Sequence, residues 1–157
     1  MYQGSIHLHS LLRWAIFILL LVLIYKAFSG RKGQRAFTEA DRKMALFLLI
    51  FSHIQLVIGL YQWFTGGYGI HIFDSLSFSE VMKNRTFRFF SVEHSTGMII
   101  AIALITIGYS KAKRAVTDAA KWNALYWPLF FALILLLVTI PWPFREVGAG
   151  RAWFPGL

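Results

Sequence analysis

Four stretches of this chain are each apolar and long enough to cross a lipid bilayer as a helix, which needs about 20 residues. They run over about residues 6–28, 44–64, 89–109 and 125–142 of the 157-residue sequence. A segment in hydrocarbon must satisfy its backbone hydrogen bonds internally, and a single segment does so only as a helix. We therefore expect one all-α domain over residues 1–157, an integral membrane up-down four-helix bundle.

Basic residues are concentrated in the two short connections of this expected bundle. The sequence has 16 lysines and arginines against 7 acidic residues, a formal net charge of +9. Most of these cations lie between the first and second spans or between the third and fourth. Since cytoplasmic loops are enriched in Lys and Arg, we predict that both termini face outward. The partner that this charge indicates is an anionic lipid bilayer and not nucleic acid.

The single long connection, residues 65–88, joins the second and third spans. Its three glycines near the start favour a turn just outside the bilayer. Ser77 and Glu80 then have the spacing of a capping box, which predicts a short interfacial helix. Thr38 and Asp41 have the same spacing, so the second helix should begin in the aqueous loop before its apolar part.

Several kinds of chemistry are excluded by what the sequence lacks. It has no cysteine, which rules out disulfides, thiolate catalysis, iron–sulfur clusters and covalent haem attachment through cysteine. It also has no nucleophile–base pair and no glycine-rich phosphate loop. The first ten residues lack a basic region and no small-residue cleavage site follows, so we expect the first span to be retained.

Ionisable residues inside membrane helices are costly and tend to mark function. The candidates within the spans are His9, Arg13, His53, Glu93 and His94. On a helical wheel Arg13 lies about 40° from His9, so the two share one face. His7 points to the opposite side and is expected at the interface.

Depth in the membrane pairs two of these histidines. At about 1.5 Å per residue, His9 lies roughly 5 Å and His94 roughly 8 Å below the outer ends of their spans, whereas His53 lies roughly 16 Å deep. The first and third helices of an up-down bundle are diagonal and parallel, so His9 and His94 can face each other. Such a pair can hold one haem iron from both sides. Arg13 would then pair with a haem propionate or with Glu93.

A simpler reading of each histidine stays open, because histidines also form hydrogen bonds between membrane helices. This reading is stronger for His53, since the polar side chains of its helix lie on nearly the opposite face. Those side chains are Ser52, Gln55 and Gln62, with Gly59 among them. His53 is thus a second cofactor ligand, a quinone contact or neither.

Three stretches resemble small b-type cytochromes of the cytochrome b561 kind. They are "LHSLLRWAIFILLLV" with His9, "SHIQLVIGLYQWFTG" with His53 and "FFSVEHSTGMIIAIALITIGY" with His94. A four-helix half of haem A synthase has a similar layout, and the whole chain is most similar to small bacterial membrane proteins labelled cytochrome b. The resemblance implies haem b and a bacterial inner (cytoplasmic) membrane with periplasmic termini. The fourth span has no histidine, which favours one haem over two.

Two functions follow from these observations. The first is a membrane b-type cytochrome in which His9 and His94 bind one haem near the outer face. It would transfer electrons to or from quinone or another subunit of a respiratory chain, without a substrate of its own. The alternative is a haem-free accessory or assembly subunit of a membrane complex, in which the same histidines are hydrogen-bonding groups. A transporter is less favoured, because no span is visibly broken.

Overall fold

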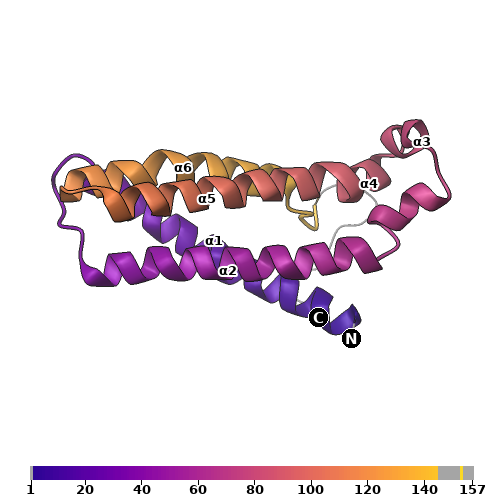
Figure 1. Ribbon diagram of the computed structural model, residues 1–157, viewed down its shortest axis with the longest axis horizontal. Helices are drawn as coiled ribbons and strands as arrows, with labels where there is room; N and C mark the ends of the chain where they lie inside the picture. The colour runs from indigo at the N-terminus through magenta and orange to yellow at the C-terminus, as the bar shows by residue number, and fades with distance from the viewer. Residues whose placement is uncertain (1, 145–152, 154–157) are drawn as a thin grey trace.

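The structure, a computed structural model, describes residues 2–144 and residue 153. It is all-α, as predicted, with four long apolar helices packed as a bundle (Figure 1). These helices are α1 (Tyr2–Gly30), α2 (Glu39–Thr65), α5 (Ser95–Arg114) and α6 (Asp118–Thr139). Each belongs to a helical stretch that is long and apolar enough to cross a membrane, so the chain has four candidate spans.

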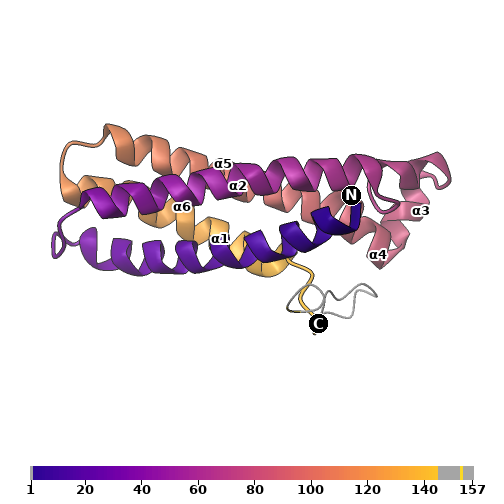
Figure 2. The ribbon, with the colours of Figure 1, turned by 90° about the horizontal axis from the view of Figure 1, so that it is seen from below.

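The four long helices form a ring in which α1 contacts α2 and α6, and α5 contacts the same two helices. This leaves α1 and α5 on the diagonal, as expected of an up-down bundle. The interface between α5 and α6 is the most extensive and that between α2 and α5 the sparsest. Figure 2 shows the two short basic loops at one end, and the N-terminus with the long connection at the other.

The long connection is largely helical. It contains the 3₁₀ helix η1 (Ile70–Asp74) and the short helices α3 (Phe78–Lys83) and α4 (Arg85–Arg88). The predicted capping box is present at the start of α3, where Ser77 and Glu80 bond reciprocally. After α4 the chain forms a π-helical turn, η2 (Phe89–His94), that continues directly into α5.

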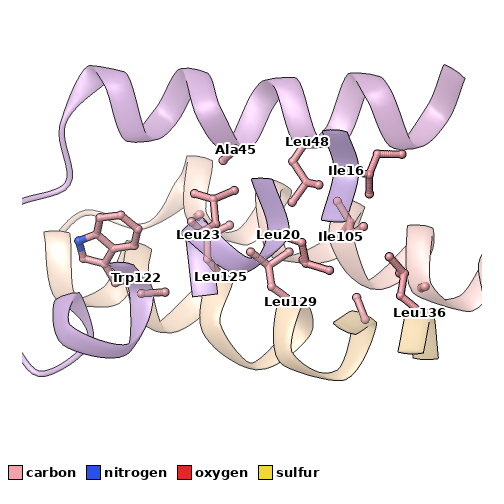
Figure 3. Packing of buried hydrophobic residues seen from close by; sticks show 14 of the residues in the cluster. Ile16, Leu20, Leu23, Ala45, Leu48, Ile105, Trp122, Leu125, Leu129 and Leu136 are labelled. Atoms are coloured by element: carbon pink, nitrogen blue, oxygen red, sulfur yellow. The ribbon is translucent and has the colours of Figure 1, made fainter. Parts of the chain in front are cut away.

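The core of the bundle is a layer of aliphatic side chains that all four long helices supply (Figure 3). Its fully buried members include Leu20, Leu23, Leu48, Ile105, Leu125 and Leu129. The outer surface is apolar as well: Ile18, Val57 and Val138 are each more than half exposed. Helices that are apolar on all sides are typical of membrane spans, where lipid covers the outer face.

The basic end of the bundle is fixed by one buried carboxylate. Asp41 is fully buried, and its side chain accepts hydrogen bonds from Lys26 Nζ at 2.7 Å and from Thr38 Oγ1 at 2.8 Å. The predicted capping box at Thr38 and Asp41 is therefore present. Beside it, Trp122 donates from Nε1 to the carbonyl of Arg35 at 3.1 Å. Gly30 is required here, because a Cβ would overlap the Trp122 ring.

Replacing Asp41 with alanine should strongly destabilise the fold. The change removes the partner of Lys26 and opens the capping box, so we expect a loss of about 2–4 kcal/mol in the free energy of unfolding. Denaturant titration of the detergent-solubilised protein, followed by circular dichroism, measures this loss. Glu39→Ala is the control, because Glu39 pairs with Arg42 on the surface and should matter far less. Equal losses in both variants would contradict the stabilising role of the buried Asp41 carboxylate.

Candidate functional site

Two histidines from diagonal helices face each other near the end of the bundle that holds the N-terminus. His9 comes from α1 and His94 from the last position of η2, and their ring centroids are 6.3 Å apart with an interplanar angle of 62°. A metal held between two imidazole nitrogens, at about 2 Å from each, separates the ring centroids by about 6 Å. The structure thus brings the depth-matched pair together at a spacing that suits two ligands of one metal.

The π-helical turn helps to place His94 at this position. In η2 the wider turn changes the hydrogen-bonding pattern of the backbone, and the carbonyl of Ser91 accepts a bond from Trp63 Nε1 at 3.0 Å. The hydroxyl of Ser91 donates to the carbonyl of Tyr68 at 2.8 Å. These bonds join η2 to α2 and to the long connection. Such π turns are rare and are found frequently at functional sites.

The protonated nitrogen of His94 is set by the end of α6. Its Nδ1 lies 2.7 Å from the carbonyl oxygen of Thr139. A carbonyl only accepts, so Nδ1 carries the proton and the Nε2 lone pair of the neutral ring is available to a metal. The carbonyl is available because Thr139 is the last residue of α6, and the last carbonyls of a helix have no N–H donor within it.

Pro141 leaves a second carbonyl of α6 without a backbone donor. Pro141 lies four residues after Leu137, and the Leu137 carbonyl accepts from Trp142 Nε1 at 2.9 Å instead of from a backbone N–H. The sequence "TIPWP" (139–143) therefore both ends α6 and leaves two carbonyls for side chains. One of them orients His94.

Two glycines provide the space for the histidine pair. Gly97 lies against Thr139, where a Cβ would overlap the threonine methyl group, so α5 and α6 approach closely beside His94. Gly59 lies against His9, and a Cβ there would be 3.3 Å from Cε1 of the ring. Gly59 belongs to the polar stripe of the second span and lines the cavity beside the pair, whereas Gly97 sets the close approach of α5 to α6.

A cavity of about 440 Å³ adjoins the two rings. Its walls come mainly from α1, α2 and α5, and they include Leu60 and Ile99, which are exposed on the outside of the bundle. The cavity therefore opens between α2 and α5, where helix packing is sparsest. Its volume lies in the range of about 300–1,000 Å³ that is usual for small-molecule and cofactor sites.

Buried polar atoms without a hydrogen-bond partner gather around this cavity. Four of the five that occur in the described part of the chain belong to residues that line it: His9 Nδ1, Arg13 Nε, Ser52 Oγ and Gln55 Oε1. Such atoms are uncommon in folded proteins, and a bound ligand or water is an ordinary explanation. Ser52 and Gln55 are site residues that the sequence identified only as a polar stripe.

Arg13 lies in the wall of the cavity and is only 8% exposed. Its Nη2 donates to the carbonyl of Trp153 at 3.2 Å, and its Cζ lies 5.4 Å from the ring centroid of Trp14. No carboxylate among the described residues pairs with it. The expected pairing with Glu93 is wrong, because that side chain is exposed and accepts from Arg88 Nε at 2.6 Å. The propionate alternative stays a prediction.

The other two histidines of the first two spans lie away from the pair. His53 is exposed on the outer face of α2, and its Nδ1 donates to the Leu49 carbonyl at 2.9 Å. Ser52 and Gln55 occupy the inner face of the same helix, so the polar stripe faces the cavity and His53 faces outward. His7 is exposed too, in line with the interfacial position expected for it.

Comparisons with known proteins identify no relative: no protein family, no curated protein and no solved structure matches the chain. The resemblance to b-type cytochromes therefore rests on the three short stretches that carry His9, His53 and His94. Function has to be argued from the site itself, since a four-helix bundle hosts many functions.

Adding a methyl group at Gly97 should destabilise the bundle. Alanine favours a helix over glycine by about 1 kcal/mol, but at this position it would push Thr139 away, and overpacking costs about 1–3 kcal/mol. Gly4→Ala is a matched control, because a Cβ at Gly4 meets nothing within 4 Å. Thermal unfolding should show a lower midpoint for Gly97→Ala and an unchanged or higher one for Gly4→Ala. The same midpoint for both variants would contradict the close packing at Thr139.

Proposed function

We propose that this protein is a membrane b-type cytochrome that binds one haem between His9 and His94 and transfers electrons. The observation that carries the proposal is the facing pair of imidazoles, 6.3 Å apart at their centroids, beside a cavity with unpartnered polar atoms. Neutral imidazole is a common axial ligand of haem iron, and bundle cores commonly hold such cofactors.

A haem suits the donor set better than a bare metal ion does. In the described residues, no group of three or more histidine, cysteine, aspartate or glutamate side chains could hold a metal. A metal held by His9 and His94 must therefore bring its other ligands, which a porphyrin does. The buried guanidinium of Arg13 has no carboxylate partner among the residues that the structure describes, and a haem propionate would supply a negative charge.

The residues around the pair would orient the ligands and tune the cofactor. The Thr139 carbonyl holds the His94 ring in one orientation and increases its basicity as a ligand. Gly59 leaves room for the His9 ring, and the positive charge of Arg13 favours the reduced state of a nearby iron. When bound, the haem supplies one-electron chemistry, and the chain supplies position, charge and exclusion of water.

The place of the site in the bundle favours electron exchange at one membrane face. His9 and His94 lie near the end that carries the long connection, opposite the two basic loops. With those loops in the cytoplasm of a bacterial cell, the site is near the periplasmic face of the inner membrane. One haem there would exchange electrons with membrane quinone or a neighbouring respiratory subunit. The role of His53 as a further cofactor ligand or quinone contact stays a separate proposal.

Replacing either facing histidine should abolish haem binding through two imidazoles. The full chain, expressed with haem available and purified in detergent, should contain about one haem per chain. His9→Ala and His94→Ala should each lose most of it, because one imidazole cannot hold the iron from both sides. Pyridine haemochrome assay and the Soret band measure the haem content.

His7→Ala and His53→Ala are the matched controls, since both side chains are exposed and neither lines the cavity beside the pair. They should keep the haem, and loss of haem in His53→Ala would instead make His53 a ligand. A purified wild-type chain without a Soret band, and with none after haem is added, would favour the haem-free accessory subunit. The double variant His9→Ala, His94→Ala gives a second test of the accessory-subunit alternative. If this variant folds and still assembles with other membrane subunits, the result would favour that alternative.

Replacing Arg13 should lower the reduction potential of the haem. Arg13→Gln removes a buried positive charge, and this removal stabilises the more positive ferric state relative to the ferrous state. We expect a shift on the order of tens of millivolts to lower potential, since about 59 mV corresponds to a tenfold change for one electron. Potentiometric titration measures it, and Arg13→Lys, which keeps the charge, should shift it much less. An unchanged potential in Arg13→Gln would place the charge away from the haem.

A further inference from the structure

At the opposite end of the bundle, two cations share one aromatic ring. Arg31 and Lys32 directly follow the last turn of α1, and both lie over Phe28, with Arg31 Cζ at 5.4 Å and Lys32 Nζ at 4.7 Å from its centroid. Arg31 also lies 4.1 Å from the ring centroid of Tyr126 and 5.4 Å from that of Trp127, both on α6. We call Phe28, Arg31, Lys32, Tyr126 and Trp127 the aromatic cradle.

Neither cation of the cradle is neutralised within the described part of the chain. The nearby carboxylates are already paired with other cations: Asp41 with Lys26, Asp118 with Lys121 and Glu39 with Arg42. The Nε atom of Arg31 is buried and has no hydrogen-bond partner. Two uncompensated positive charges close to one ring repel each other, and a bound anion would reduce that repulsion.

The surrounding surface strengthens the attraction for an anion. The two loops and adjoining helix ends carry ten lysines and arginines between residues 26–43 and 111–121, against three carboxylates in the same ranges, a net of seven positive charges. Trp127 and Phe131 stack with centroids 6.2 Å apart and are each about half exposed. Phe131 lies one helical turn beyond the cradle, toward the middle of the bundle and on the surface that lipid would cover.

We propose that the aromatic cradle binds the phosphate of an anionic phospholipid. Arg31 and Lys32 would hold the phosphate oxygens, and an acyl chain would lie on Trp127 and Phe131. A free phosphate would satisfy the two cations equally well, but it would leave this aromatic surface unused. Basic pockets between membrane helices are known binding places for anionic lipid headgroups. The proposal is independent of haem, because the cradle and the histidine pair lie at opposite ends of the bundle (Figure 2).

Lipid binding to the purified full chain tests this proposal. The protein is delipidated in a neutral detergent and titrated with short-chain phosphatidylglycerol, short-chain phosphatidylcholine or inorganic phosphate, and native mass spectrometry counts the bound molecules. We expect one tightly held phosphatidylglycerol and weak binding of the other two. Arg31→Gln should weaken the binding of phosphatidylglycerol about fivefold. The double variant Arg31→Gln, Lys32→Gln should weaken it about 25-fold, as expected for two interfacial cations.

Lys113→Gln is the matched control, because Lys113 is an exposed cation at the same end and lies outside the cradle. It should change the affinity less than twofold. Arg31→Lys keeps the charge without the planar stacking on Tyr126, and should fall between wild type and Arg31→Gln. Circular dichroism of each variant confirms that it is folded.

Three results would overturn the proposal. Equal loss in Lys113→Gln and Arg31→Gln would mean diffuse attraction to the whole basic end. Equal binding of phosphatidylcholine would mean that the charges are not used. Binding of inorganic phosphate as tight as that of phosphatidylglycerol would mean a phosphate site without a role for the acyl chain.

Discussion

The hydrogen bond between His94 and the Thr139 carbonyl links the site to the fold. It exists because α6 ends at Thr139, two residues before Pro141, which leaves the Thr139 carbonyl without an intrahelical N–H donor. It needs Gly97, which allows α5 to approach Thr139, and it lies where the π-helical turn of η2 joins α5. A proline, a glycine and a wide helical turn thus fix one imidazole in one tautomer. The facing ring of His9 then defines a site between the two helices.

The end of the bundle that carries this site differs in character from the basic end. At the basic end, the buried carboxylate is paired: Asp41 is fully buried and bonded to both Lys26 and Thr38. Around the cavity, by contrast, polar atoms of Ser52 and Gln55 are buried without partners. Leaving such groups unpaired costs free energy inside a membrane bundle. This contrast supports a bound ligand at the histidine end and a purely structural role for the buried carboxylate.

The sequence was sufficient to predict the architecture and the proximity of His9 and His94 across the bundle. Span length, loop charge and helical periodicity depend on local composition, and membrane helices follow them closely. It was not sufficient for Arg13, whose hydrogen bond to the Trp153 carbonyl comes from a segment far along the chain. The π-helical turn at Phe89–His94 has no sequence signal that we recognise, and the pairing of Glu93 with Arg88 follows from it and from α4. The polar stripe opposite His53 became informative only when helix packing showed which face points inward.

The most direct test is the coordination state of the iron in the wild-type chain. Electron paramagnetic resonance of the purified, oxidised, haem-loaded protein separates two axial imidazoles from one. We predict a low-spin ferric signal typical of bis-histidine ligation, with about one spin per chain. A high-spin signal would mean that only one of the two imidazoles binds the iron. The absence of any haem signal after reconstitution would contradict the haem assignment as a whole.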